Sequence, residues 1–261
     1  MKLAVHGAAG RMGQSVVRLA RADGVRIVGA IEASRSVHIG KDVGDLAGAG
    51  HAGVAIGEDT AAGLLGADVV IDFSHADSVP RLVQLAARTN VAIVSGTTRL
   101  DARAERAFEA ASRIVPVLWS PNMSVGVHVL ARAVADAVKS LGAEFDVEIV
   151  ETHHRQKVDA PSGTANLLAA AVKSARGDLS EIHGREGNVG ARRDSELAVF
   201  ALRGGDVIGD HTVHLLGQGE HLEFTHRATN RDLFARGALR VAQFLCGKPA
   251  GMYSMADVVG A

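Results

Sequence analysis

The fold of the first half is decided by the stretch Lys2-Leu3-Ala4-Val5-His6-Gly7-Ala8-Ala9-Gly10-Arg11-Met12-Gly13. Its first five residues predict a short strand, and a helix is predicted from Arg11 to Ala22. Three glycines, each separated from the next by two residues, lie where the strand gives way to the helix. Glycines there let the backbone turn sharply and approach a pyrophosphate, which the helix N-terminus stabilises. A tight turn without a ligand is the alternative that this motif alone leaves open.

The residues that follow favour a dinucleotide site. Glu32 ends a second predicted strand, Arg26–Glu32, nineteen residues after Gly13. An acidic side chain at this place accepts hydrogen bonds from a ribose diol. A carboxylate there favours NADH because it repels a 2′-phosphate, whereas Arg35 is near enough in sequence to neutralise that phosphate. We therefore expect NADH, NADPH or both as cofactor.

Strand-like and helix-like segments alternate throughout this half of the chain. Nearly continuous aliphatic runs, such as Val69-Val70-Ile71, are typical of strands covered by helices on both faces. The alternation predicts an α/β fold with a doubly wound, parallel sheet of the Rossmann type. The further strands are expected at Asp68–Phe73, Val91–Ser95 and Val115–Trp119, and the helices at Ala61–Gly66, Ser78–Thr89 and Ala102–Ser112.

Small or polar residues follow several of these strands. Ligands of open α/β sheets bind beyond the carboxyl ends of the strands, so these residues are expected on the nicotinamide side of the site. The segments are Asp72-Phe73-Ser74, Gly96-Thr97-Thr98 and Ser120-Pro121-Asn122, and their candidate cofactor residues are Phe73, Gly96, Thr98, Ser120 and Asn122.

The pattern changes near Pro121, where a second domain of α+β type with a mixed or antiparallel sheet is predicted. The boundaries expected are 1–123 for the dinucleotide-binding domain, 124–231 for the second domain, and 232–261 for a segment that returns to the first. The elements expected after Pro121 are helices at Val125–Ser140, Thr164–Ala175 and Asp232–Leu245, strands at Phe145–Glu151, Glu196–Leu202, His211–Leu216 and Leu222–Thr225, an exposed loop at Gly184–Arg193 and a hairpin turn at residues 217–220.

The second domain carries a basic cluster, His153-His154-Arg155-Gln156-Lys157, in a chain whose formal charge is −1. Such a cluster has an unfavourable self-energy unless anions bind to it. Ser162-Gly163-Thr164 lies at a predicted helix start, where backbone N–H groups and hydroxyls bind a carboxylate. Two anion-binding features side by side predict a small substrate with two carboxylates, and an imidazole of the cluster is a candidate proton donor. A solvated basic loop is the alternative.

Composition excludes several classes of function. Lys plus Arg is 28 and Asp plus Glu is 29, a balance that argues against a dedicated nucleic-acid binder. Cys246 is the single cysteine, and no apolar stretch has transmembrane length. We expect a soluble, cytoplasmic protein without membrane or nucleic-acid partners.

Histidines on the later strands raise the question of a metal. The candidates are His211, His214, His221 and His226. Their spacing matches no common metal-binding motif, so no metal is predicted and they are expected to face solvent or other subunits.

Residues 148–165 resemble the signature E-x-x-E-x-H-H-x-x-K-x-D-x-P-S-G-T-A of the 4-hydroxy-tetrahydrodipicolinate reductase family, long called dihydrodipicolinate reductase. The resemblance runs nearly end to end. It includes Gly7–Gly13, Ile71–Ser74, Gly96–Thr98, Pro121–Gly126, Arg203–Asp206 and Phe234–Ala238.

This resemblance implies a homotetramer joined through the sheets of its central domains. It also implies reduction of a cyclic imine dicarboxylate by NADH or NADPH on the way to diaminopimelate and lysine. In the family pattern His153 donates the proton, with Lys157 as its partner. The substrate carboxylates are then held by His154, Lys157, Gly163 and Thr164, to which the helix start adds Ser162. The cofactor is lined by Gly7, Arg11, Met12, Glu32, Gly96, Thr98 and Asn122, to which the loop and strand ends add Gly10, Gly13, Arg35, Phe73 and Ser120.

Two other functions are compatible with part of the sequence. An acylating semialdehyde dehydrogenase needs a cysteine nucleophile after a strand, and Cys246 lies near the C-terminus instead. A dinucleotide sensor without catalytic activity is compatible with the fold. A sensor, however, gains nothing from a proton donor beside a carboxylate site. The reductase therefore accounts for more of the sequence than either alternative.

Overall fold

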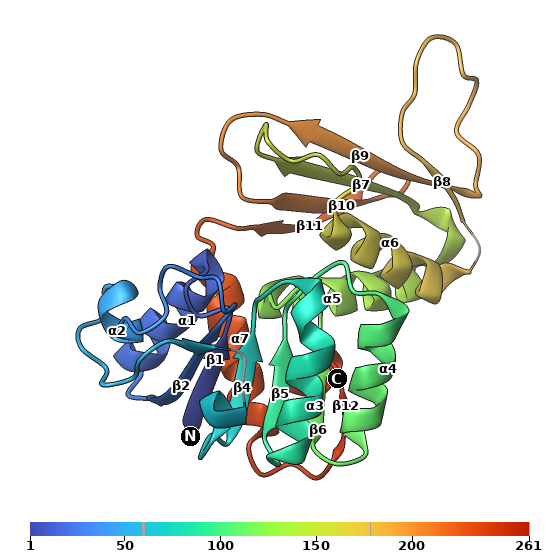
Figure 1. The fold of residues 1–261 in the computed structure, drawn as a ribbon. Coiled ribbons are helices and arrows are strands. Elements are labelled where there is room, and N and C mark those ends of the chain that lie inside the picture. The colour runs from blue at the N-terminus through green and yellow to red at the C-terminus, as the bar shows by residue number, and fades with distance from the viewer. Residues whose placement is uncertain (59–60, 178, 261) are drawn as a thin grey trace. The chain divides into compact units, whose positions relative to one another are not determined.

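The computed structural model describes residues 1–58, 61–177 and 179–260, and the chain forms two compact units (Figure 1). The first unit consists of Met1–Ser124 together with Asp232–Ala261, and the second is Val125–Arg231. Each unit has its own sheet. In the described part of the chain, no helix combines the length and the apolar character needed to cross a membrane.

The sheet of the first unit is parallel throughout and has seven strands. In spatial order they are β12 (Gly251–Tyr253), β6 (Pro116–Trp119), β5 (Ala92–Ser95), β4 (Val69–Asp72), β1 (Lys2–His6), β2 (Arg26–Glu32) and β3 (Gly57–Glu58). From β1 the chain runs outward to β2 and β3 and then returns to β4 on the other side. The strand order therefore reverses between β1 and β4, which is where open α/β sheets bind their ligands. The predicted Rossmann-type sheet is confirmed.

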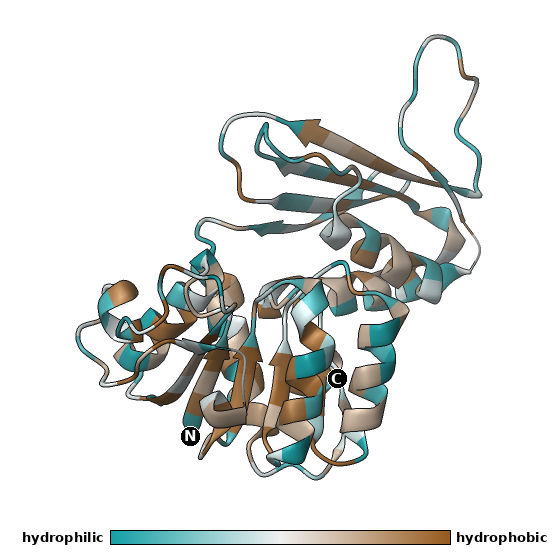
Figure 2. Ribbon diagram, in the orientation of Figure 1, coloured by the Kyte–Doolittle hydropathy of each residue, from teal (hydrophilic) through white to brown (hydrophobic). Residues whose placement is uncertain are grey.

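Helices cover both faces of this sheet (Figure 1). Helices α3 (Val79–Arg88) and α4 (Ala102–Ser112) pack together, as do α1 (Arg11–Ala22) and α7 (Asp232–Leu245), and α7 also contacts β4, β5 and β6. Figure 2 shows the hydrophobic colouring of the central strands, and every residue of β4 and β5 is buried. Burial on both faces explains the continuous aliphatic runs in the sequence.

The short elements of this unit differ most from the prediction. The helix expected at Ala61–Gly66 is a single 3₁₀ turn, η1 (Ala61–Leu64). A Cβ at Gly29 would lie 1.9 Å from the carbonyl oxygen of Gly63, so the turn packs directly on the backbone of β2. Strands β3 and β12 and the C-terminal helix α8 (Met255–Val259) were not predicted. The remaining short elements are α2 (Val43–Leu46) and η2 (Ala76–Ser78).

The second unit contains a five-stranded mixed sheet, as predicted. Strand β10 is antiparallel to both β7 and β11, whereas β9 is parallel to β7 and β8. In spatial order the strands are β11 (His221–Arg227), β10 (Asp210–Leu216), β7 (Asp146–His153), β9 (Glu196–Arg203) and β8 (Ser180–Ile182). The expected hairpin turn joins β10 to β11, with the N–H of Gly217 donating to the carbonyl of Glu220 at 2.9 Å. Strand β8 was missed.

Helices α5 (Val125–Leu141) and α6 (Gly163–Arg176) cover one face of this sheet, and η3 (Gly142–Glu144) follows α5. Alternation along β7 turns Val147 and Ile149 toward the helices, together with Glu151 and His153. Two polar residues of β7 therefore lie on the buried face of the sheet, close to the start of α6.

Candidate active site

The glycine loop of the first unit packs backbone against backbone. Gly7 has φ +74°, and a Cβ there would lie 2.4 Å from the carbonyl oxygen of Phe73. A Cβ at Gly13 would lie 2.2 Å from the carbonyl oxygen of Gly7. Helix α1 begins after Gly10, which no described side chain caps. An uncapped helix start beside a turn this tight is suited to an anion such as a pyrophosphate.

Glu32 lies against this loop. Its Oε2 accepts a hydrogen bond from the N–H of Ala9 at 3.0 Å, and its Oε1 accepts one from the N–H of Ala33 at 3.1 Å. A cavity of about 360 Å³ opens beside Glu32 and is also lined by Glu58, Asp77 and Arg81. The residues present therefore fit a nucleoside: a carboxylate for the ribose and a cavity next to it. Arg35, the predicted partner of a 2′-phosphate, is exposed and does not line the cavity, whereas Arg81 does.

A buried carboxylate connects three strand ends of the same site. Asp72 is fully buried, and its Oδ1 accepts from His6 Nδ1 at 2.8 Å and from Ser74 Oγ at 2.6 Å. Its Oδ2 accepts from Ser95 Oγ at 2.6 Å and from Thr97 Oγ1 at 2.8 Å. Burial alone would raise the pKa of this carboxyl, but these hydrogen bonds outweigh burial and lower it. The ionised Asp72 therefore fixes the ends of β1, β4 and β5.

Four of the other predicted cofactor residues lie in two pairs. Phe73 and Gly96 lie together, because a Cβ at Gly96 would be 2.1 Å from the Phe73 ring. Ser120 and Asn122 form a turn in which Ser120 Oγ donates to the carbonyl of Asn122 at 2.7 Å. Thr98 and Arg11 are exposed, and Met12 is half-buried.

In the second unit, polar groups gather around Glu151, which is fully buried. Arg203 donates from both Nη atoms, one to each carboxylate oxygen, at 2.8 Å each. His153 Nδ1 lies 2.6 Å from Oε2, and the N–H of Ser162 donates to Oε1 at 3.0 Å. Burial would raise the pKa of Glu151, but the bonds from Arg203 and His153 lower it, so the carboxylate is ionised. Neither Glu151 nor Arg203 was predicted as a site residue.

His153 is buried, and the groups around it shift the pKa of its imidazole in opposite directions. Burial lowers the pKa of its imidazole, Glu151 acts in the opposite direction, and Lys157 and Arg203 add to the lowering. The net effect lowers the pKa, so the ring is mainly neutral near pH 7. A Cβ at Gly209 would lie 2.9 Å from His153 Nε2, so the ring packs closely against the backbone there.

The prediction was wrong most clearly for His211 among the strand histidines, and His226 is also half-buried, with burial lowering its pKa. His211 was expected at the surface, yet its exposed fraction is 3% and its Nε2 lies 2.9 Å from Ser162 Oγ. Its ring meets that of His153 edge-on, with centroids 5.1 Å apart, and burial lowers its pKa to about 3. The alternation of β10 places His211 on the side of Val213 and Leu215, facing the helices.

Three of the predicted substrate residues, Ser162, Gly163 and Thr164, form the start of α6. Ser162 caps this helix, with its Oγ accepting from the N–H of Ala165 at 3.1 Å. Gly163 is exposed and Thr164 half-buried in the first turn. Lys157 donates to both carboxylate oxygens of Asp159 at 2.9 Å each. The main-chain N–H of His154 donates to the carbonyl of Val207 at 2.7 Å. The hydroxyl and N–H of Ser162 are thus used inside the protein.

Comparison with known proteins assigns the chain to a family. The profile for "Dihydrodipicolinate reductase, N-terminus" matches residues 1–123, and that for its C-terminus matches residues 126–259. A 4-hydroxy-tetrahydrodipicolinate reductase of Anaeromyxobacter sp. (strain Fw109-5) is 50% identical over 264 residues, which cover 100% of this chain and 98% of the relative. One of Geobacter sulfurreducens is 43% identical, covering 99% and 98%.

The chain belongs to the dihydrodipicolinate reductase family. The resemblance indicated by the sequence is therefore confirmed.

Solved structures agree on the fold. A dipicolinate-bound dihydrodipicolinate reductase from Paenisporosarcina sp. TG-14 has a TM-score of 0.75 at 23% identity and covers 98% of each chain. An amine dehydrogenase from Mycobacterium smegmatis has a TM-score of 0.63 at 14% identity and covers 98% of this chain and 95% of its own. Because the same fold carries different activities, the sequence match rather than the fold places the chain among dihydrodipicolinate reductases.

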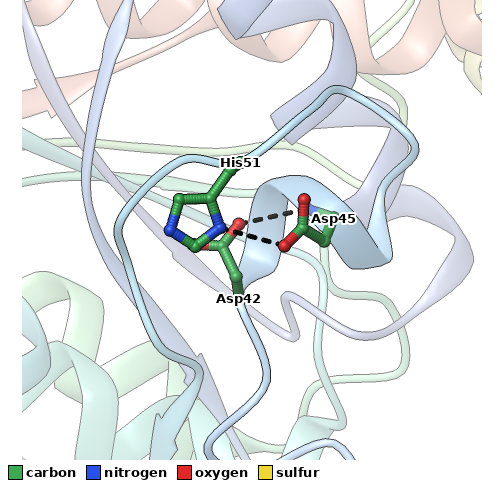
Figure 3. Close-up of side chains that lie close together, drawn as sticks. All are labelled: Asp42, Asp45 and His51. Atoms are coloured by element: carbon green, nitrogen blue, oxygen red, sulfur yellow. Dashed lines mark hydrogen bonds and ion pairs between the residues drawn. The ribbon is translucent and has the colours of Figure 1, made fainter.

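A third cluster resembles a metal site but has a structural explanation (Figure 3). In the described ranges, Asp42, Asp45 and His51 are the one group with metal-ligand atoms close together, within 4.8 Å of one another. Asp42 accepts backbone N–H bonds from the helix it caps, α2, and from Ala52 and Val54 at 2.9 Å each. These bonds use the lone pairs that a cation would need. The cluster therefore fastens the loop that follows α2.

Proposed function

We propose that this chain reduces 4-hydroxy-tetrahydrodipicolinate, by way of dihydrodipicolinate, to tetrahydrodipicolinate with NADH or NADPH. The reaction belongs to diaminopimelate and lysine biosynthesis, and we place it in the cytoplasm. The observation that carries the proposal is the ionised Glu151 holding His153 near Lys157 and the start of α6, in a chain that matches these reductases along its whole length.

The first unit is proposed to hold the cofactor. The start of α1, with Gly7, Gly10, Arg11, Met12 and Gly13, would bind the pyrophosphate, and Glu32 the adenosine ribose. The nicotinamide end is assigned to Phe73, Gly96, Thr98, Ser120 and Asn122. When bound, the cofactor supplies a hydride to C4 of the substrate ring.

The charges around the ribose favour NADH. The cavity beside Glu32 is lined by two further acids, Glu58 and Asp77, against the single arginine Arg81. A 2′-phosphate would meet these carboxylates at close range, and repulsion between like charges weakens its binding. We expect a higher kcat/KM with NADH than with NADPH.

The second unit is proposed to hold the substrate. We assign the two carboxylates of the substrate to His154, Lys157, Gly163 and Thr164. There, cations and the N-terminus of α6 offer charge-assisted hydrogen bonds. Ser162 supports this binding through its cap, because its own N–H and hydroxyl already have partners inside the protein.

His153 is proposed to donate the proton. Hydride addition at C4 pushes an electron pair through the conjugated system toward the imine nitrogen and leaves an enamine. A proton from His153 then completes the addition of one hydride and one proton to the substrate. The imidazole of His153 returns to its neutral form. Two substrate carboxylates beside the imidazole raise its pKa, so substrate binding favours the protonated donor.

We further propose that the protein is a homotetramer joined through the sheets of its second units. On the sheet face opposite α5 and α6, Leu202 is 49% exposed and Leu216 is 39% exposed. A contact between sheets would cover these two apolar side chains.

A turnover assay tests the proposed function. The purified protein is supplied with freshly condensed 4-hydroxy-tetrahydrodipicolinate, and loss of the near-ultraviolet absorbance of NADH or NADPH is followed. We expect oxidation that depends on the substrate and is more efficient with NADH. A lack of substrate-dependent oxidation with both cofactors would contradict the proposal.

A further inference from the structure

We infer that Glu151 is a positioning residue that fixes the tautomer of His153, so that Nε2 is the nitrogen that gives and takes the catalytic proton. This inference rests on the proposed function for the role of His153. The resemblance gave Glu151 no role, and the tautomer of His153 can be examined in the resting protein without turnover.

The hydrogen bonds around Glu151 determine the direction of the bond to His153. The two guanidinium N–H groups of Arg203 and the N–H of Ser162 can only donate. They keep the carboxylate ionised, and an ionised carboxylate can only accept. The 2.6 Å contact therefore requires a proton on Nδ1 of His153. In the neutral ring this leaves a lone pair on Nε2.

Packing keeps the ring in this orientation. Rotating the imidazole by half a turn would place a carbon against Glu151 and lose the 2.6 Å hydrogen bond. On its other side the ring faces the backbone of Gly209, where a Cβ would lie 2.9 Å from Nε2, and it meets the edge of His211. The ring is therefore held in one orientation as well as in one tautomer.

The same carboxylate connects His153 to the loop that carries Lys157. Arg203 uses one Nη atom for both Glu151 and the carbonyl of Asp159, the latter at 2.8 Å. The carboxylate of Asp159 in turn binds Lys157. The proton donor and the proposed carboxylate-binding lysine are thus held by one continuous set of hydrogen bonds.

Several charges act on His153, and they oppose one another. Lys157 and Arg203 disfavour its protonated form, whereas Glu151 favours it. His211, on β10, is neutral near pH 7 because burial lowers its pKa to about 3, and Asp159 is paired with Lys157. Removing the charge of Glu151 leaves both cations unopposed, so the pKa of His153 falls further.

Glu151→Gln is the test, and Glu148→Gln is the matched control. Glu148 lies on the same strand and is also bound by an arginine through two hydrogen bonds, from Arg185 at 2.9 Å each. It points to the opposite face of the sheet and has no contact with His153 among the described residues. Both variants lose a buried, arginine-paired charge, but only Glu151→Gln should change the tautomer and the pKa of His153.

Nitrogen-15 NMR of histidine-labelled protein reads the tautomer directly. In the wild type we expect neutral His153 to carry its proton on Nδ1. In Glu151→Gln the Nε2-protonated form should appear, since the amide can donate to Nδ1. Glu148→Gln should keep the wild-type tautomer.

The pH dependence of kcat measures the effect of Glu151 on the pKa of His153. Because the protonated ring is the donor, kcat declines as pH rises through the pKa of His153 in the complex. In Glu151→Gln that decline should move to lower pH by about one unit or more, the size expected for losing a neighbouring charge. At neutral pH kcat should fall ~10-fold or more, while the KM for NADH stays unchanged. Activity should recover as pH is lowered, which a purely structural defect would not allow.

Three results would overturn the inference. They are a wild-type His153 protonated on Nε2, a Glu151→Gln variant with the wild-type tautomer and pH profile, and a Glu148→Gln variant with the same shifts as Glu151→Gln. The first needs no variant, so it decides the case even if Glu151→Gln fails to fold. Absence of turnover in the wild type would instead refute the proposed function and leave the tautomer result intact.

Discussion

Asp72 is a single buried residue that holds together the strand ends at which the cofactor is proposed to bind. It is fully buried and ionised, and it receives hydrogen bonds from His6, Ser95 and Thr97. Asp72→Asn removes the charge and leaves some of these donors without an acceptor. Breaking a buried pair in this way costs about 3–5 kcal/mol, which we expect as a loss of unfolding free energy in urea at pH 7.

The pH dependence of that loss follows from the direction of the pKa shift. The pKa of Asp72 in the folded protein lies below its ordinary value of 3.8, so its contribution is present above that value and is lost as pH falls through the folded pKa. The difference between wild type and Asp72→Asn should therefore shrink below about pH 4. Asp23→Asn, at an exposed carboxylate, is the control. A difference that stays constant down to low pH would contradict this account.

Sequence reasoning named candidate site residues that lie close together in the chain and missed the residues that pair with them over long distances. His153, Lys157 and Ser162 lie within a few positions of one another. Arg203 is 52 residues from its partner Glu151, and that separation is set by the strand order of a mixed sheet. One signal was present. Glu151 follows Val147 and Ile149 at a spacing of two residues, so it shares the inner face of the strand with them, and a charge there must be paired.

At the scale of elements, the start of α1 carries the clearest prediction. A Cβ at Gly13 would lie 2.2 Å from the carbonyl oxygen of Gly7, a backbone atom that cannot move aside as a flexible side chain can. Gly13→Ala should therefore cost about 1–3 kcal/mol of stability and weaken NADH binding at least ~10-fold, measured by fluorescence titration. Gly184→Ala is the control, because nothing lies within 4 Å of a Cβ at that position. Unchanged NADH affinity in Gly13→Ala would disprove the role given to this loop.

Long periodic elements were predictable and short ones were not. The bounds of the five strands that were predicted between Lys2 and Trp119 agree with the structure to within a residue or two, because buried parallel strands have an unmistakable composition. Strands β3, β8 and β12 have two or three residues each, too few for any period to appear. The stretch Gly184–Arg193 is a loop and, apart from the half-buried Arg192, is exposed, as predicted. The sequence could not show that Arg185 and Arg192 bind Glu148, because that pairing depends on tertiary structure.

At the scale of the whole molecule, the proposed tetramer makes a measurable prediction. Multi-angle light scattering should give a mass near four chains of 27.1 kDa. Leu202→Lys places a charge on the proposed sheet contact and should reduce that mass while leaving the circular dichroism spectrum unchanged. Ile114→Lys is the control, because Ile114 is 57% exposed but lies in the first unit. A single-chain mass for the wild type, or a tetrameric Leu202→Lys, would refute this contact.

His153, held by Glu151, is proposed to supply the proton that completes the reduction. Steady-state kinetics of His153→Gln test it most directly, with the Kd for NADH measured alongside and His221→Gln, at an exposed histidine, as control. Loss of a general acid typically lowers the rate ~10²–10⁴-fold, so we predict a fall of that size in kcat with an unchanged Kd for NADH. A His153→Gln enzyme with wild-type kcat would contradict the claim and move the proton donor elsewhere.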